Sequence, residues 1–172
     1  HPAGASVGVS SVPPKGMFFA QVKSVNYLPN VLMKKQAVDA GVDFMLGFDA
    51  NGNMTELPTE NFGIVTRERV LRVPKPDHIL QGTTMARVLE LARRELVPAG
   101  ILAGVEEADV PRAQLADAAE MLVFGTTPNV TAVTQFDGRP VGDGQPGPVW
   151  RELSRLFEAD LRDPQRLTPL FD

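Results

Sequence analysis

The stretch Gln21-Val-Lys-Ser-Val-Asn-Tyr-Leu-Pro-Asn30 is the most informative part of the chain, because it places one lysine where an apolar strand is predicted to give way to a helix. Apolar side chains alternate through residues 18–22, and this period of two predicts a strand with Lys23 at its C-terminal end. Asn26 is then expected to cap a helix that carries Pro29 in its first turn, where the missing N–H is harmless. A lysine held at the end of an apolar strand is a candidate for imine chemistry.

The bulk composition predicts one ordinary folded domain with a small metabolite as its partner. The 172 residues are 43% hydrophobic and 22% charged, with a net charge of −4 and no basic block. This balance lacks the electrostatic footprint of a nucleic-acid-binding protein. No apolar run approaches the roughly 20 residues of a membrane helix, and the N-terminus lacks signal-peptide features. We therefore expect a cytoplasmic protein with neither nucleic acid nor a membrane as partner.

Cysteine and histidine chemistry contribute little to the prediction. The chain contains no cysteine, which excludes disulfides and thiolate sites. Its two histidines have no partner at metal-ligand spacing, so no metal is expected.

The N-terminal residues 1–16 are predicted to be the remnant of an interdomain linker. They begin with His-Pro and are rich in glycine, serine and proline, a composition typical of linkers. The folded domain is accordingly expected over residues 17–172, as one part of a longer protein.

The periodicity of the remaining chain predicts an α+β fold, with a mixed, mainly antiparallel sheet and packed helices, because strands and helices do not alternate regularly. The first helix is expected to end at Gly41, and Asn51-Gly52 is expected to turn a hairpin between residues 43–49 and 53–57. The apolar stripe of that first helix comprises Leu28, Val31, Leu32 and Val38. The other predicted strands cover residues 62–66, 70–73, 101–105, 120–124 and 130–136, and the other helices residues 85–96, 111–118 and 148–161.

Two Gly-Thr-Thr loops are candidates for an anion site. Gly82-Thr83-Thr84 opens a predicted helix, and Gly125-Thr126-Thr127 follows a predicted strand. The start of a helix has unsatisfied N–H donors and a favourable dipole, so two such loops that converge can hold a phosphate. Taken alone, each loop is more typical of a helix cap or a turn.

Two further side chains are candidates for contacts with a heterocyclic cofactor. Glu56, just after the predicted hairpin turn, can pair with a ring nitrogen; Glu60 is the competing candidate, and a solvated glutamate at a sheet edge is the alternative for both. Tyr27, the only tyrosine, lies four residues beyond Lys23. Its hydroxyl can bond a phenolic oxygen, although a packed aromatic at a helix start is equally compatible.

Together these motifs resemble the class IV aminotransferases, the pyridoxal-phosphate enzymes of fold type IV. The resemblance covers about residues 19–161 and rests on the order and spacing of several segments. These are residues 22–30, 55–61, 79–84, 125–127 and 142–148. The resemblance implies the large C-terminal domain of the D-amino-acid aminotransferase-like fold, without the small N-terminal domain of that family.

The resemblance also implies a role for each candidate residue toward pyridoxal 5'-phosphate. Lys23 would be the catalytic residue, joined covalently to the cofactor and then serving as base and acid. Glu56 would pair with the pyridine nitrogen, and Tyr27 would support the phenolic oxygen. The phosphate would be held by Gly82, Thr83, Thr84, Gly125 and Thr126, while Thr127 would contact the substrate.

The implied activity is amino-group transfer between a branched-chain or aliphatic amino acid and 2-oxoglutarate, because Asn26-Tyr-Leu28 resembles the branched-chain members. D-amino-acid transaminase and aminodeoxychorismate lyase are alternatives within the same fold, and an inactive cofactor-binding fragment is the alternative outside enzymes. Gln81, Met85 and Pro128-Asn129 depart from the residues usual around the two loops, which leaves the substrate open. We expect a homodimer whose N-terminal domain completes the site.

Overall fold

The structure is a computed structural model and describes residues 3–165. Its strands are β1 (Ala5–Val9), β2 (Phe44–Leu46), β3 (Asn61–Val65), β4 (Val70–Pro74), β5 (Gly104–Ala108), β6 (Glu120–Gly125), β7 (Asn129–Phe136) and β8 (Arg139–Pro140). Its α-helices are α1 (Met17–Ala20), α2 (Leu28–Ala40), α3 (Thr83–Leu91), α4 (Arg112–Leu115) and α5 (Pro148–Leu161), and a π-helical segment, Ala92–Leu96, continues α3.

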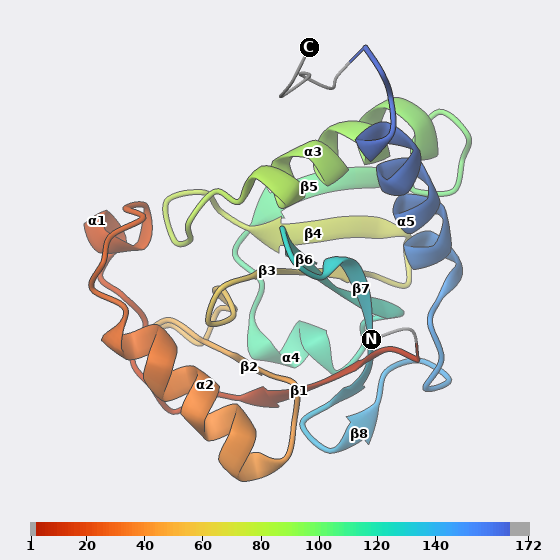
Figure 1. Cartoon of the computed structure of the whole chain (residues 1–172). Coiled ribbons are helices and arrows are strands. Elements are labelled where there is room, and N and C mark those ends of the chain that lie inside the picture. Colours follow the sequence, from red (N-terminus) through yellow and green to blue (C-terminus); the bar gives the residue numbers. More distant parts are fainter. Residues whose placement is uncertain (1–2, 166–172) are drawn as a thin grey trace.

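Within residues 3–165 the eight strands form one mixed sheet, in the order β2-β1-β7-β6-β3-β4-β5 with β8 beside β7 (Figure 1). The pairs β3–β4, β3–β6, β6–β7 and β7–β8 are antiparallel, whereas β1–β2, β1–β7 and β4–β5 are parallel. A parallel pair needs a crossover connection, and α2 and α3 provide it for β1–β2 and β4–β5. The predicted α+β class with a mixed sheet is confirmed.

The core lies on both faces of the sheet. Helices α3 and α5 cover one face, where Val88, Leu153 and Phe124 belong to one buried cluster (Figure 1). The other face packs against α4, with Phe62 and Leu115 in a second buried cluster. Full burial of each such side chain contributes roughly 1.5 to 3 kcal/mol, so both clusters stabilise the packing of the helices on the sheet.

The predicted linker contains a strand of the sheet, so the boundary at residue 17 is wrong. Strand β1 lies between β2 and β7, and Ala5 and Val7 are each 1% exposed. Close packing favours a glycine at one position of this strand. A Cβ atom on Gly8 would lie 2.8 Å from Sδ of Met45.

The predicted strand over residues 18–22 is also wrong. The segment begins with the short helix α1, and its backbone bonds locally, since the Ala20 N–H donates to the Gly16 carbonyl over 2.9 Å. No strand of the described chain pairs with it, and Phe18 is 73% exposed. Lys23 therefore lies in an exposed loop rather than at the end of a buried strand.

Helix α2 begins and ends close to where the sequence predicts. Pro29 lies in its first turn, and Gly41 ends it with a left-handed φ of 66°, a conformation that glycine adopts at little cost. The residue at the cap position is Tyr27 rather than Asn26.

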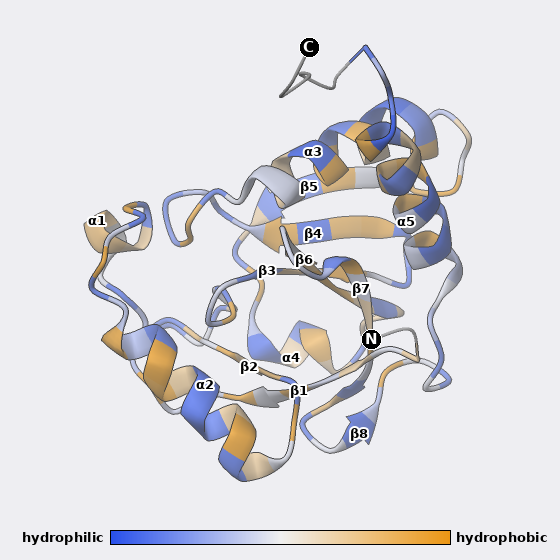
Figure 2. Ribbon diagram, viewed as in Figure 1, coloured by the Kyte–Doolittle hydropathy of each residue, from blue (hydrophilic) through white to orange (hydrophobic). Residues whose placement is uncertain are grey.

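The orientation of α2 differs from the prediction, because its leucines and valines face outward. The buried residues are Asn30, Met33 and Ala37, and the last two belong to one buried cluster with Met45 of β2. The predicted apolar stripe is exposed, and Figure 2 shows it as hydrophobic bands along α2. Periodicity identifies an apolar face but does not say what covers it.

Most of the other predicted elements are present, but the predicted return strand over residues 53–57 is wrong, because this stretch forms only isolated bridges. Gly52 turns the hairpin with a φ of 79°, and its N–H donates to the Asp49 carbonyl over 3.0 Å. Helix α5 has the predicted bounds, whereas β5 begins three residues after the predicted start at residue 101. In the part of the chain that the structure describes, no helix combines the length and apolarity needed to cross a membrane.

Candidate functional site

A pocket of about 210 Å³ lies between the loop that joins α1 to α2, the approach to β3 and the start of α3. The predicted cofactor residues that line it are Lys23, Tyr27, Glu56, Gly82, Thr83, Thr84, Gly125 and Thr126. The structure thus brings together residues that lie far apart in the sequence. Thr127, the predicted substrate residue, is not among the residues that line this pocket.

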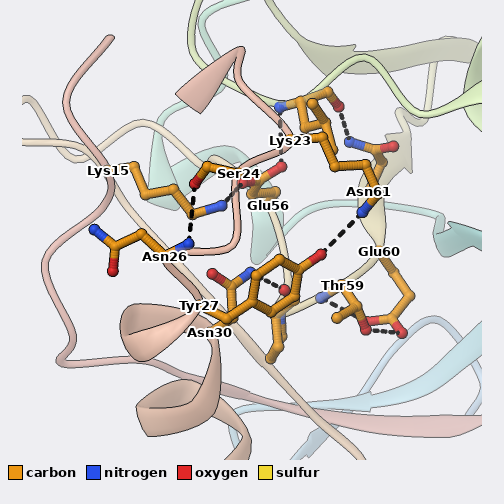
Figure 3. A network of polar contacts seen from close by, with 12 residues as sticks. Lys15, Lys23, Ser24, Asn26, Tyr27, Asn30, Glu56, Thr59, Glu60 and Asn61 are labelled. Carbon is orange, nitrogen blue, oxygen red and sulfur yellow. Dashed lines mark hydrogen bonds and ion pairs between the residues drawn. The ribbon is translucent and has the colours of Figure 1, made fainter. Parts of the chain in front are cut away.

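Lys23 extends its amine toward Tyr27. The Lys23 Nζ donates a hydrogen bond to the tyrosine hydroxyl oxygen over 2.9 Å and lies 5.6 Å from the ring centroid (Figure 3). Lys23 lies on the loop before α2, and Tyr27, four residues later, is the N-cap residue of that helix. The contact orients a primary amine at the pocket wall.

Glu56 is the carboxylate held against the pocket. Its Oε1 lies 3.4 Å from Lys15 Nζ (Figure 3). Its Oε2 accepts the Leu80 N–H over 3.0 Å. Burial raises the pKa of Glu56, while the Leu80 N–H and the Lys15 charge act in the opposite direction. The ordinary alternative, a solvated glutamate at the sheet edge, does not describe this side chain, which is 17% exposed.

The competing candidate, Glu60, lines the same pocket but is bonded differently. Its carboxylate accepts hydrogen bonds from the Thr59 N–H over 3.2 Å and from the Thr59 hydroxyl over 2.5 Å. This local contact occupies Glu60 at its own turn. Glu56 is therefore the better placed of the two to meet a ring nitrogen.

The start of α3 offers an anion site of backbone donors. Gly82 is the N-cap residue, in an extended conformation, and no side chain caps the helix. The alternative in which Thr83 or Thr84 serves only as a cap is therefore not observed. Thr84 is 6% exposed and Thr83 is exposed, and both line the pocket. An uncapped helix of nine residues presents unsatisfied N–H groups that favour an anion.

Asn61 explains why a glycine precedes α3. Its Nδ2 donates to the Leu80 carbonyl over 2.7 Å, and its Oδ1 lies where a Cβ atom on Gly82 would be. Gly125 is required for a similar reason, because a Cβ there would approach Glu60 Cγ and Pro128 Cδ at 2.9 Å. The two glycines thus let the loops close around the pocket.

Two other pocket residues, Lys15 and Asn30, have little signal in the sequence. Lys15 lies in the stretch predicted as a linker, where no pattern marks it. Asn30 is 7% exposed on α2; its Nδ2 donates to the Pro58 carbonyl, while its Oδ1 has no hydrogen-bond partner among the described residues. Asn30 lies three residues before Met33 and seven before Ala37, so all three share the buried face of α2. This register is the one feature of the sequence that could have marked Asn30 as buried.

The geometry of the pocket defines a class of site. A primary amine, a carboxylate and an uncapped helix start in one pocket suit a small ligand that carries a carbonyl, a basic ring nitrogen and a phosphate. The chain belongs to the class IV aminotransferase family, whose model matches residues 4–136.

Individual relatives support this membership. The chain is 37% identical over 163 residues to the chloroplastic D-amino-acid transaminase of Arabidopsis thaliana, covering 94% of this chain and 43% of that protein. It is 31% identical over 151 residues to a probable branched-chain-amino-acid aminotransferase of Aquifex aeolicus, covering 85% and 47%. Among solved structures, the branched-chain amino acid aminotransferase from Thermobaculum terrenum in its PLP-form superposes with a TM-score of 0.85 at 26% identity, covering 98% and 56%. The chain spans about half the length of these relatives.

Proposed function

We propose that this chain is the cofactor-bearing part of a pyridoxal-phosphate-dependent aminotransferase. The observation that carries the proposal is the single pocket shared by the Lys23 amine, the Glu56 carboxylate and the start of α3. The similar Thermobaculum terrenum enzyme, which was crystallised in its PLP-form, supports the choice of cofactor.

The residues present fit pyridoxal phosphate by their chemistry. The uncapped start of α3, with Thr83 and Thr84, supplies donors for a phosphate. Glu56 accepts only two hydrogen bonds from described residues, whereas a carboxylate offers about four lone-pair sites, so it can also accept one from a ring nitrogen. When bound, the cofactor supplies a carbonyl carbon that joins an amine and a ring that withdraws electrons from the substrate.

Lys23 and Tyr27 then have defined tasks. Lys23 Nζ would hold the cofactor covalently, and as a free amine it would be placed to take the proton from the substrate α-carbon and to return it later. The Tyr27 hydroxyl, 2.9 Å from Nζ, keeps this amine oriented between the two events.

We propose a branched-chain or other aliphatic amino acid and 2-oxoglutarate as the substrates. The similarity to branched-chain aminotransferases in both sequence and structure supports this choice. A D-amino acid is the second candidate, because the similarity to the Arabidopsis D-amino-acid transaminase reaches 37% identity.

We also propose that the rest of the protein covers the mouth of the pocket. Val22 and Lys23 line the pocket, while Val25 beside them is fully exposed and Phe19 is 62% exposed. Apolar side chains gathered in this way beside a site indicate a contact surface. The length of the relatives, about twice that of this chain, supports a contribution from further polypeptide.

The full-length protein with cofactor should be incubated separately with L-leucine or D-alanine, each with 2-oxoglutarate, and with aminodeoxychorismate alone. We expect 2-oxoglutarate to be converted to glutamate when L-leucine is the amino donor. Chiral analysis of the glutamate then shows which enantiomer the enzyme forms. Turnover of D-alanine instead would favour the second candidate, and elimination from aminodeoxychorismate would indicate a lyase. Lys23→Ala should abolish turnover while Lys35→Ala, an exposed lysine on α2, retains it. Absence of turnover with all three substrates would refute the proposal.

A further inference from the structure

Lys15 reaches the pocket from an ordered arm, residues 10–16, that follows β1. Ser10 anchors the arm twice, through its N–H to the Leu46 carbonyl and its hydroxyl to Gln36 Oε1, both over 2.8 Å. Gln36 in turn donates from Nε2 to the Ser11 hydroxyl over 2.6 Å. Two prolines then restrict the backbone immediately before Lys15. The arm is therefore docked on α2 and delivers one lysine to a fixed place.

The side chain of Lys15 is only 20% exposed. A lysine that loses most of its water needs a compensating charge. The Glu56 carboxylate, at 3.4 Å, provides it. Two elements far apart in the sequence thus meet through one ion pair at the pocket wall (Figure 3).

We propose that Lys15 is a positioning residue that holds Glu56 ionised and in place for the ring nitrogen of the cofactor. The inference rests on the proposed function, because it assumes that Glu56 meets that nitrogen. Lys15 contacts one carboxylate oxygen and the Leu80 N–H the other, so both oxygens of Glu56 are held.

The ion pair also opposes the effect of burial. Desolvation favours the neutral form of Glu56, which is a weaker partner for a protonated ring nitrogen. The charged groups that line the same pocket are Lys15, Lys23 and Glu60. Lys23 is the residue proposed to join the cofactor covalently, and Glu60 adds like charge. His78 lines an adjoining cavity with Lys15 and Glu56, but its ring nitrogens lie 3.7 Å from Asp49 and 3.5 Å from Asp77. Lys15 is therefore the cation that contacts Glu56.

The opposite effect of Lys15 would be competition with the ring nitrogen for the same carboxylate. The two effects predict opposite results when the charge is removed. If Lys15 positions Glu56, its loss weakens cofactor binding. If Lys15 competes, its loss strengthens binding.

The test compares Lys15→Met, Lys15→Arg and the wild type in the full-length protein, with exposed Lys35→Met as the matched control. The carboxyl carbon of Glu56 is followed by ¹³C NMR against pH before cofactor is added, with Glu56→Gln to assign the signal. Cofactor affinity is then measured by fluorescence titration. The NMR measurement reports on the ion pair even if the protein binds no cofactor, so failure of the proposed function is seen separately.

We expect Lys15→Met to move the Glu56 titration to higher pH and to weaken cofactor binding roughly 3- to 10-fold. Lys15→Arg should restore both properties, because it keeps the charge, and Lys35→Met should change neither. An unchanged Glu56 titration in Lys15→Met, or tighter cofactor binding, would overturn the inference.

Discussion

The Nζ of Lys23 and the hydroxyl of Tyr27 are joined by a hydrogen bond of 2.9 Å at the wall of the pocket. Both side chains come from one short segment, so no tertiary contact is needed to bring them together. The hydrogen bond gives the exposed Lys23 side chain a preferred direction. The sequence instead predicts that burial at the end of a strand orients it.

Tyr27→Phe should therefore slow amino-group transfer by about tenfold while leaving the fold intact, because it removes the hydrogen bond that orients the Lys23 amine. Single-turnover measurements with the cofactor-loaded protein separate this loss from any change in substrate binding. A rate equal to that of the wild type would show that the contact does not orient the amine.

Gly82→Ala should weaken phosphate binding at α3, because the new Cβ atom displaces Asn61 and with it the hydrogen bond to Leu80. Gly104→Ala is the matched control, since a Cβ atom there meets nothing within 4 Å. We expect a loss in cofactor affinity of about tenfold for Gly82→Ala only. Calorimetric titration with pyridoxal phosphate measures these affinities. If Gly82→Ala binds the cofactor as tightly as the wild type, the contact between Gly82 and Asn61 does not shape the phosphate site.

Arg87 and Asp160 fasten α3 to α5 by two hydrogen bonds of 2.8 and 2.5 Å, with both side chains largely buried. Arg87→Met should lower the free energy of unfolding by about 1 to 3 kcal/mol. Arg155→Met, which breaks an exposed pair within α5, should cost less than about 0.5 kcal/mol. Urea denaturation measures both variants, and similar losses would mean that burial of the ion pair has no effect.

The pH dependence of stability should also depend on Glu56. Burial raises its pKa above the ordinary 4.5, so the native protein binds this proton more readily than the unfolded chain. The contribution of Glu56 to the free energy of unfolding is complete below about pH 4.5 and is lost as the pH rises through the pKa of the native state.

Glu56→Gln removes this loss, so the stability of the variant relative to the wild type should increase from pH 4.5 to pH 7. Urea denaturation at both pH values gives the comparison, with the exposed Glu158→Gln as control. A difference that stays constant with pH would contradict the assignment of the burial effect.

Local signals in the sequence predicted much of the fold. Pro29, Gly41 and Gly52 act through their own backbone preferences, and the structure places each where those preferences predict. The predictions failed where the outcome depends on distant neighbours. Residues 18–22 alternate like a strand but have no strand to pair with among the described residues, and β1 has a linker-like composition but lies within the sheet.

The candidate site shows the same division. Motif order was sufficient to nominate Lys23, Tyr27, Glu56 and the two loops, and the structure brings all of them to one pocket except Thr127. Lys15 and Asn30 could not be nominated, because their places depend on the docking of an arm and on which face of α2 is buried.

The most direct test of the central claim is borohydride reduction of the full-length protein with pyridoxal phosphate, followed by peptide mapping. Reduction makes a bond between lysine and the cofactor permanent, and two lysines, Lys15 and Lys23, line the pocket. We expect a single modified residue, Lys23, and no modification of this pocket in Lys23→Ala. Modification of Lys15 in the wild-type protein, or of neither lysine, would contradict the claim.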